Sequence, residues 1–224
     1  MKTSIFSAVI ALQLLVTEAI AGAWLREKGT SFSSFSLSTS LFRETRSSGY
    51  LEFGLTENST LGLDTGLSQN ANGEKLAYGT LFMRRALGSG AGPNQWAYEV
   101  GLGATYRGGV DAQPHVKTGL SWGRGIQFRG KGGWIAADAA ALWAISDDEH
   151  VSKIDTTLGL NFNNRFSGIL QLNFAYQEGE TFKYFEPSIV FNPPNTGLKI
   201  QFGLITPLDE PENSGVKLGL WREF

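Results

Sequence analysis

Apolar and polar residues alternate along almost the whole chain, from Thr30 to the last residue, Phe224. The clearest stretch is Ser34–Leu41, which reads SFSLSTSL. A period of two is typical of a β-strand with one apolar and one polar face. No helical stripe, Pro/Ser linker or shift in composition interrupts the pattern after residue 30, so the sequence predicts a single all-β domain.

Turn-forming residues divide this pattern into about twelve strands. Gly, Pro, Asn and Asp gather in short segments such as Asn70–Gly73 and Asn192–Asn195, because these residues favour turns. The expected strands are Ser34–Leu41, Tyr50–Leu55, Thr60–Leu67, Lys75–Arg85, Gln95–Tyr106, His115–Trp122, Trp134–Trp143, Lys153–Phe162, Ile169–Tyr176, Lys183–Phe191, Leu198–Ile205 and Val216–Phe224. Roughly 17 residues per strand and connection fit membrane strands of about 9 to 11 residues with short connections.

These lengths predict a transmembrane antiparallel up-and-down β-barrel of about twelve strands, with ten and fourteen as alternatives. An even number of strands returns both chain ends to one side. A soluble β-sandwich also alternates, but its outward residues are mainly polar and charged. Here the polar face is rich in Ser and Gly, which suits a narrow lumen where side chains converge.

Aromatic residues bracket the expected strand Gln95–Tyr106. Its apolar positions run from Trp96 and Tyr98 through Val100 and Leu102 to Tyr106. Ten residues at about 3.3 Å each, tilted by about 40°, rise roughly 25 Å, which is the height of the apolar band on an outer-membrane barrel. Aromatic side chains at both edges of such a band are typical of membrane interfaces.

The N-terminus has the order of a secretory signal peptide. Lys2 precedes the apolar stretch Ile5–Val16, and small residues then form A-x-A sites that end at Ala21 or Ala23. A short buried helix is the alternative. We therefore expect a signal peptide over residues 1–23 and a barrel domain over residues 24–224.

Composition excludes several classes of function. The chain of 224 residues has 19 Lys and Arg against 21 Asp and Glu, which gives a net charge of -2, so no nucleic-acid partner is expected. It contains no Cys and only two His, which excludes disulfides and thiolate sites and argues against a metal site. No metal, nucleotide or other cofactor is expected.

The strand pattern, the absence of Cys and the last strand, Val216–Phe224, together resemble Gram-negative outer-membrane β-barrel proteins. Members of that family end in a strand of alternating apolar residues with a terminal aromatic, which the barrel assembly machinery uses. On this resemblance, Phe224, Leu220 and Leu218 form the assembly signal, although Arg222 replaces the usual apolar residue. The resemblance also implies an outer-membrane location, contact with lipid and lipopolysaccharide, and both chain ends in the periplasm.

In that orientation the two rims of the barrel differ in charge. The outer connections are acidic, and one hypothesis is that they bind divalent cations that bridge to lipopolysaccharide; the alternative is that they are solvated loop tips. The outer acids are Asp111, Asp147, Asp148, Glu149, Glu178, Glu180, Asp209, Glu210 and Glu212. The inner rim is expected to be basic, with Arg84, Arg85, Arg124, Arg129, Lys131, Arg165 and Arg222.

With the apolar face outward, acids and lysines of nearly balanced number face the lumen. The candidate pore-lining residues are Glu52, Asp64, Glu99, Lys117, Asp138, Lys153, Asp155, Glu186, Lys199 and Lys217. Because no single sign forms a ring, we expect a weakly selective, porin-like passive channel for small solutes. A barrel plugged by the same residues, with a structural or lipid-contacting role, is the alternative. For the strand Lys75–Arg85 the pattern does not decide which set of alternate residues faces the lumen.

A third possibility comes from the tripeptide His150-Val151-Ser152. Some outer-membrane barrels are lipid hydrolases with a His-x-Ser arrangement on the lipid-facing side of a strand. A His can activate a Ser hydroxyl, and both residues have lipid-facing parity. No orienting residue follows in the sequence, so a lipid hydrolase is the least favoured of the three functions. His115 is expected to face the lumen as a polar residue.

Overall fold

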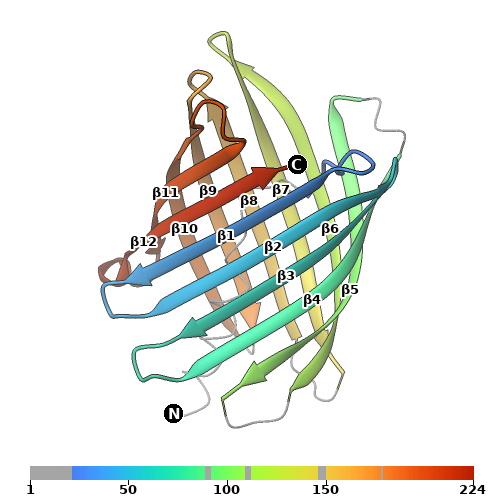
Figure 1. Ribbon diagram of the computed structural model, residues 1–224. Coiled ribbons are helices and arrows are strands. Elements are labelled where there is room, and N and C mark those ends of the chain that lie inside the picture. The colour runs from blue at the N-terminus through green and yellow to red at the C-terminus, as the bar shows by residue number, and fades with distance from the viewer. Residues whose placement is uncertain (1–21, 89–91, 109–111, 146–149, 178) are drawn as a thin grey trace.

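Twelve antiparallel strands form one closed barrel in the computed structural model (Figure 1). The structure describes residues 22–88, 92–108, 112–145, 150–177 and 179–224. Residues 1–21 of the expected signal peptide lie outside these ranges, and so do the outer acids Asp111, Asp147, Asp148, Glu149 and Glu178. The predicted fold class, a transmembrane up-and-down barrel of twelve strands, is confirmed.

Each expected strand overlaps one observed strand. The strands are β1 Ser31–Ser40, β2 Thr45–Thr56, β3 Ser59–Gln69, β4 Lys75–Ala86, β5 Asn94–Arg107, β6 Gln113–Phe128, β7 Lys131–Ala144, β8 His150–Asn161, β9 Phe166–Gln177, β10 Glu180–Phe191, β11 Leu198–Pro207 and β12 Gly215–Glu223. A 3-10 turn, η1, covers Pro211–Asn213 between β11 and β12. Among the described residues, no helix is long and apolar enough to cross a membrane.

The barrel closes where the first strand meets the last. In Figure 1 the blue β1 and the red β12 lie side by side, and they pair in register from Phe32 opposite Glu223 to Ser40 opposite Gly215. The backbones of Ser31 and Phe224 exchange two further hydrogen bonds, of 2.7 and 3.0 Å. Closure leaves no strand with a free edge, which is the condition for a sheet to span a membrane.

We call the end where Ser31 meets Phe224 the inner end, and the opposite end the outer end. The three Asn-containing turns, at residues 57–59, 163–165 and 192–195, all lie at the inner end, as the strand count predicted. The strands β6 and β7 contain 16 and 14 residues. Their hairpin extends beyond its neighbours at the inner end (Figure 1).

The two faces of the sheet differ as the alternation predicted. Large apolar side chains on the outward face are exposed in every strand, and Trp96, Val100, Leu102 and Tyr106 of β5 are among them. Aromatic pairs lie near the strand ends, such as Trp96 with Trp122, whose ring centroids are 6.4 Å apart. Such pairs are typical of the aromatic girdles of membrane barrels.

The ambiguous strand β4 is settled by its burial pattern. Leu81 and Met83 are exposed on the outward face, whereas Leu76, Tyr78 and Phe82 are buried inside the barrel. Sequence parity alone did not separate the two sets because both are apolar. The lumen wall of β4 is therefore more apolar than that of the other strands near it.

Paired cysteines test the register at the closure. Leu37 and Leu218 are opposite each other and both face outward, so the double variant Leu37→Cys/Leu218→Cys is expected to form a disulfide under mild oxidation. The chain has no other Cys. The cross-linked chain, unfolded by heating, would migrate faster on a non-reducing gel.

The matched control is Leu37→Cys/Gly219→Cys, because Gly219 is the next residue and faces the lumen. Neighbouring positions on a strand point to opposite faces, so this pair is expected to stay reduced. Cross-linking of the control in place of the test pair would contradict the register of β1 on β12.

Candidate functional site

All ten predicted pore-lining residues have inward parity on their strands. Most of Glu52, Asp64, Glu99, Lys117, Asp138, Lys153, Asp155, Glu186 and Lys217 are buried. The tenth, Lys199, is partly exposed at the inner end and forms an ion pair of 3.3 Å with Glu223. Seven of the nine form two groups, one on each side of the lumen. Of the other two, Asp64 lies 3.9 Å from Lys117 and Asp138 lies beside Gly22.

The first group is centred on Arg84 of β4. Its guanidinium donates to Glu99 at 2.8 and 3.1 Å, to the Tyr50 hydroxyl at 3.0 Å, and also to Glu52. Lys117 of β6 completes the group with an ion pair of 2.8 Å to Glu99. We call these five residues the Arg84 network.

Arg84 was expected at the basic inner rim, and this placement was wrong. It has the inward parity of β4 and is only 5% exposed, whereas its neighbour Arg85 is exposed on the outward face. The other predicted rim residues lie at the inner end. Phe82 lies beneath Arg84 at 5.1 Å and Lys117 at 4.9 Å in cation–π contacts, which stabilise desolvated cations.

A glycine makes room for that aromatic ring. A Cβ atom on Gly62 of β3 would lie 2.1 Å from the Phe82 ring, which is far inside van der Waals contact. Small inward residues were expected to suit a narrow lumen, and here Gly62 leaves the space that the Phe82 ring occupies. A larger residue at position 62 would push Phe82 toward the cations above it.

The second group lies on the opposite wall. Lys153 of β8 is 3.3 Å from Asp155, and Lys217 of β12 is 3.2 Å from Glu186 of β10. Asn173 of β9 donates to the same Glu186 at 3.0 Å. Opposite charges are thus paired within the wall, as the near balance of signs predicted.

The N-terminal segment, residues 22–30, enters the lumen from the inner end. Arg26 donates to Glu52 at 2.6 Å, and its backbone N–H donates to Thr60 at 3.0 Å. The backbone N of Gly22 lies 3.2 Å from Asp138 of β7. The segment therefore reaches from the β2–β3 wall to the β6–β7 wall.

Two wall glycines seat this segment. A Cβ atom on Gly54 would lie 2.0 Å from the Glu27 carbonyl oxygen, and one on Gly123 would lie 2.4 Å from the Trp24 ring. Gly123 has the inward parity of β6. The sequence pattern carried no signal for the segment, because the alternation begins only at Thr30.

Apolar side chains also meet across the lumen, which the sequence did not predict. Near the outer end, Leu76 and Tyr78 of β4 pack with Leu142 of β7 and Val151 of β8. Near the inner end, Phe32, Ile169, Val190 and Trp221 form a second cluster, with Tyr50 and Trp134 against it. These contacts narrow the lumen at both ends.

His115 lies in the lumen, as expected. It is 5% exposed, and its Nε2 is 2.9 Å from the Thr80 hydroxyl. The described residues contain no group of three or more His, Asp or Glu side chains that could hold a metal.

A vestibule of about 640 Å³ opens at the inner end. Its polar lining includes Lys131, Arg165 and Lys199 together with Asn161 and Asn192. Trp134 and Trp221 form its apolar wall. The vestibule is therefore basic, in agreement with the predicted charge of the inner rim.

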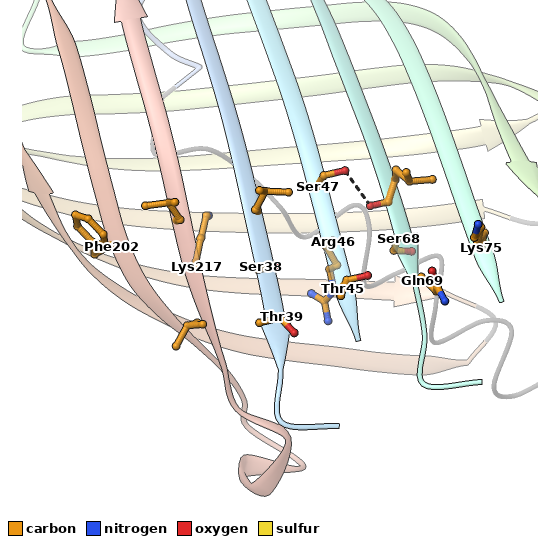
Figure 2. A pocket seen from close by; sticks show the side chains of 14 residues that line it. Ser38, Thr39, Thr45, Arg46, Ser47, Ser68, Gln69, Lys75, Phe202 and Lys217 are labelled. Carbon is orange, nitrogen blue, oxygen red and sulfur yellow. Dashed lines mark hydrogen bonds between the residues drawn. The ribbon is translucent and has the colours of Figure 1, made fainter. Parts of the chain in front are cut away.

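A second hollow, of about 610 Å³, lies on the outer half of the wall at the β1–β12 closure. Figure 2 shows its lining, in which Ser47 donates to the Leu67 carbonyl oxygen. Its apolar residues, such as Leu37, Phe202 and Leu218, are exposed on the outward face. This hollow belongs to the lipid-facing surface and not to the lumen.

The two other candidate sites lie on the outward face. The His150 ring packs against Trp143 at 5.1 Å, and Ser152 is exposed two residues further on. Within the described ranges, no hydrogen bond joins His150 to Ser152. Of the expected assembly signal, Leu218 and Leu220 are exposed on β12, and Phe224, the residue after β12, is also exposed.

A closed twelve-stranded barrel with an apolar outside and a charged lumen is the fold of outer-membrane β-barrel proteins. The chain resembles the KdgM porin at a TM-score of 0.61 and 7% identity, over 86% of this chain and 99% of that one. It resembles the COG4313 outer membrane channel from Pseudomonas putida F1 at 0.60 and 13%, over 90% and 97%.

The β-domain of the Bordetella autotransporter BrkA is also similar, with a TM-score of 0.53 and 12% identity over 89% of this chain and 100% of that one. No protein-family model matches the sequence. No curated protein matches it either. The comparisons therefore establish the fold.

Replacing Arg84 tests the Arg84 network. Arg84→Ala leaves Glu52 and Glu99 buried with one partner fewer each, and loss of one member of a buried ion pair costs about 3 kcal/mol or more. We expect the free energy of unfolding from lipid vesicles to fall by this amount in a urea titration.

Arg85→Ala is the matched control, because Arg85 is the adjacent arginine on the same strand but points outward. Exposed substitutions of this kind change stability by about 0.5 kcal/mol or less. Equal losses in the two variants would mean that the lumen network adds nothing to stability.

Proposed function

We propose that the protein is an outer-membrane channel for small polar solutes and that residues 22–30 hold its lumen closed. Similarity in fold to a porin and to an outer-membrane channel supports a channel. The observation that carries the proposal is the lumen itself, because paired charges line it on both walls.

Barrel size supports the same proposal. Eight strands enclose a lumen that side chains alone can fill, whereas 16 to 18 strands leave an open aqueous channel. Twelve strands lie between these limits, so the lumen is wide enough to hold a chain segment. When residues 22–30 leave, the space that they occupy becomes a path for solutes.

Buried polar groups of the wall support a hydrated lumen. Within the described ranges, both polar atoms of the Gln177 side chain and the hydroxyls of Ser34 and Ser68 are buried without a protein partner. Groups of this kind usually bind ordered water. Water in the lumen is the medium in which small polar solutes diffuse.

Balanced charge predicts weak ion selectivity. A ring of one sign selects against ions of that sign, but here Arg84, Lys117, Lys153 and Lys217 each have a carboxylate beside them. Arg84 and Lys117 bind Glu99, and Lys217 binds Glu186. The proposed solutes are therefore small polar molecules of either charge.

A non-conducting barrel is the second candidate function, and one observation favours it. Glu52, Glu99, Lys117, Asp155 and Lys217 are each less than 7% exposed, as in a packed core. In that case the same network only stabilises the barrel. An experiment on the N-terminal segment separates the two functions.

Displacing the segment without shortening the chain tests the channel. In the double variant Gly54→Ala/Gly123→Ala, each new Cβ atom would overlap the seated segment, so the segment is expected to leave the lumen. In planar bilayers we expect rare, small openings for the native protein and steady, larger single-channel steps for the variant.

Gly125→Ala is the control, since a Cβ atom there meets nothing within 4 Å. It should conduct as the native protein does. Heat-modifiable gel mobility shows first that each variant is folded. A folded double variant without conductance would overturn the channel and favour the non-conducting barrel.

The proposed location is the bacterial outer membrane, reached through a signal peptide. The outward apolar face is proposed to contact lipid and lipopolysaccharide. Leu218, Leu220 and Phe224 are proposed to bind the barrel assembly machinery, since all three are exposed on or directly after the last strand. Glu180, Asp209, Glu210 and Glu212 lie at the outer end, where cations bridging to lipopolysaccharide would bind.

Ser152→Ala tests the remaining hydrolase hypothesis. Because His150 packs on Trp143 and does not bond to Ser152, we expect no fatty-acid release from phospholipid micelles above that of heat-denatured protein. The variant should match the native protein. Release that disappears in Ser152→Ala would instead assign an enzyme.

A further inference from the structure

Gly22 and Ala23 occupy a close-fitting space inside the lumen, beside Asp138 near the middle of β7 and Ser121 near the middle of β6. From this fit we propose that export cleaves the chain between Ala21 and Gly22, and that the new α-ammonium group of Gly22 forms an ion pair with Asp138. The inference rests on export, which the proposed outer-membrane location requires. It goes beyond the channel, because it assigns a processing site and the group that receives its product.

The sequence leaves two cleavage positions open. A-x-A sites end at both Ala21 and Ala23, and small residues at these positions suit either cleavage. Cleavage after Ala23 would make Trp24 the first residue. The two positions therefore differ by whether Gly22 and Ala23 remain in the mature protein.

Gly22 fits its surroundings closely. Its backbone N lies 3.2 Å from Oδ1 of Asp138. A Cβ atom at position 22 would lie 2.7 Å from both the Asp138 carboxylate and the Ser121 hydroxyl, and 3.1 Å from the Arg84 guanidinium carbon. This space accepts glycine, and a larger first residue would press on all three side chains.

Ala23 and Trp24 fit equally closely against β6. Ala23 is 4% exposed, and a Cβ atom on Gly123 would lie 2.9 Å from the Ala23 methyl and 2.4 Å from the Trp24 ring. The β6 wall is thus recessed where these residues lie. Cleavage after Ala23 would remove the two residues for which the space exists.

The chemistry of cleavage matches the charge at this place. Hydrolysis of the Ala21–Gly22 peptide bond by a signal peptidase consumes one water and leaves a carboxylate on Ala21 and an ammonium on Gly22. Before cleavage, the nitrogen is an amide with one N–H and no charge. Afterwards it carries three donors and a positive charge, and a charged hydrogen bond to a carboxylate is roughly twice as strong as a neutral one.

Within the described ranges, no wall cation forms an ion pair with Asp138, although Ser121 hydrogen-bonds to it and Arg84 and Lys153 interact with it electrostatically. It is directly opposite Asp155 of β8, and Lys153 is bound to Asp155 at 3.3 Å. Arg84 is shared between Glu52 and Glu99. The Gly22 ammonium would give this carboxylate an ion-pair partner and fix the free end of the segment across the lumen from Arg26.

Mass spectrometry of the processed protein tests the cleavage site. The full-length precursor is expressed in a Gram-negative host, and the mature protein is purified from its outer membrane and digested with trypsin. We expect the N-terminal peptide Gly22–Arg26, GAWLR, with a free amine. The peptide Trp24–Arg26, WLR, would overturn the inference.

Amine labelling tests the ion pair. The Gly22 amine of the folded native protein is expected to react at least ten-fold more slowly than in urea, as measured on its tryptic peptide. Asp138→Asn should raise the rate in the folded protein several-fold. Glu186→Gln, the control at a buried carboxylate paired with Lys217, should leave it unchanged. Equal rates in folded native protein and folded Asp138→Asn would overturn the ion pair.

A second variant keeps the test decisive if Asp138→Asn does not fold. Gly22→Ala keeps the carboxylate but places a methyl group in its space, so its N-terminal amine is expected to react several-fold faster than that of Gly22. An unchanged rate would contradict the close fit of Gly22 beside Asp138. Neither peptide mass nor labelling depends on conductance, so failure here and failure of the proposed channel are distinguishable.

Discussion

Backbone hydrogen bonding at the β1–β12 closure is the interaction on which the rest of the structure depends. In a bilayer, no water satisfies the N–H and C=O groups of a free strand edge, so a sheet must close on itself. Closure here rests on the pairing of β1 with β12 and on two further bonds between Ser31 and Phe224. It fixes which side chains point inward, and therefore which charges meet in the lumen.

The inward charges form an interior of an unusual kind. A soluble protein buries apolar residues, but here most large apolar residues face outward, and ion pairs around Arg84 and Glu186 lie between two smaller apolar clusters in the lumen. Removal of one partner from such a pair is more damaging than the pair is stabilising. The lumen is therefore specific in its pairing, and changes of single charges disturb several strands at once.

Much of the fold followed from the alternation, because a period of two assigns each residue to one face once the barrel is assumed. All twelve strands and the inward parity of the ten candidate residues followed in this way. The alternation did not separate the two faces of β4, because both are apolar. It also did not indicate that the aromatic residues Phe32 and Trp221 point inward. It also missed residues 22–30, since a segment without regular structure has no period and its seat is formed by glycines distant in sequence.

The position of Glu52 between two arginines affects how easily the N-terminal segment can leave. Glu52 accepts from Arg26 of the segment and from Arg84 of the wall, and the Tyr50 hydroxyl also donates to it. When Arg26 departs into water, the carboxylate keeps two partners, so no unpaired charge remains behind. At Glu52 the wall therefore keeps its hydrogen bonds in either state of the segment, so release of Arg26 costs less there than the loss of a sole partner would.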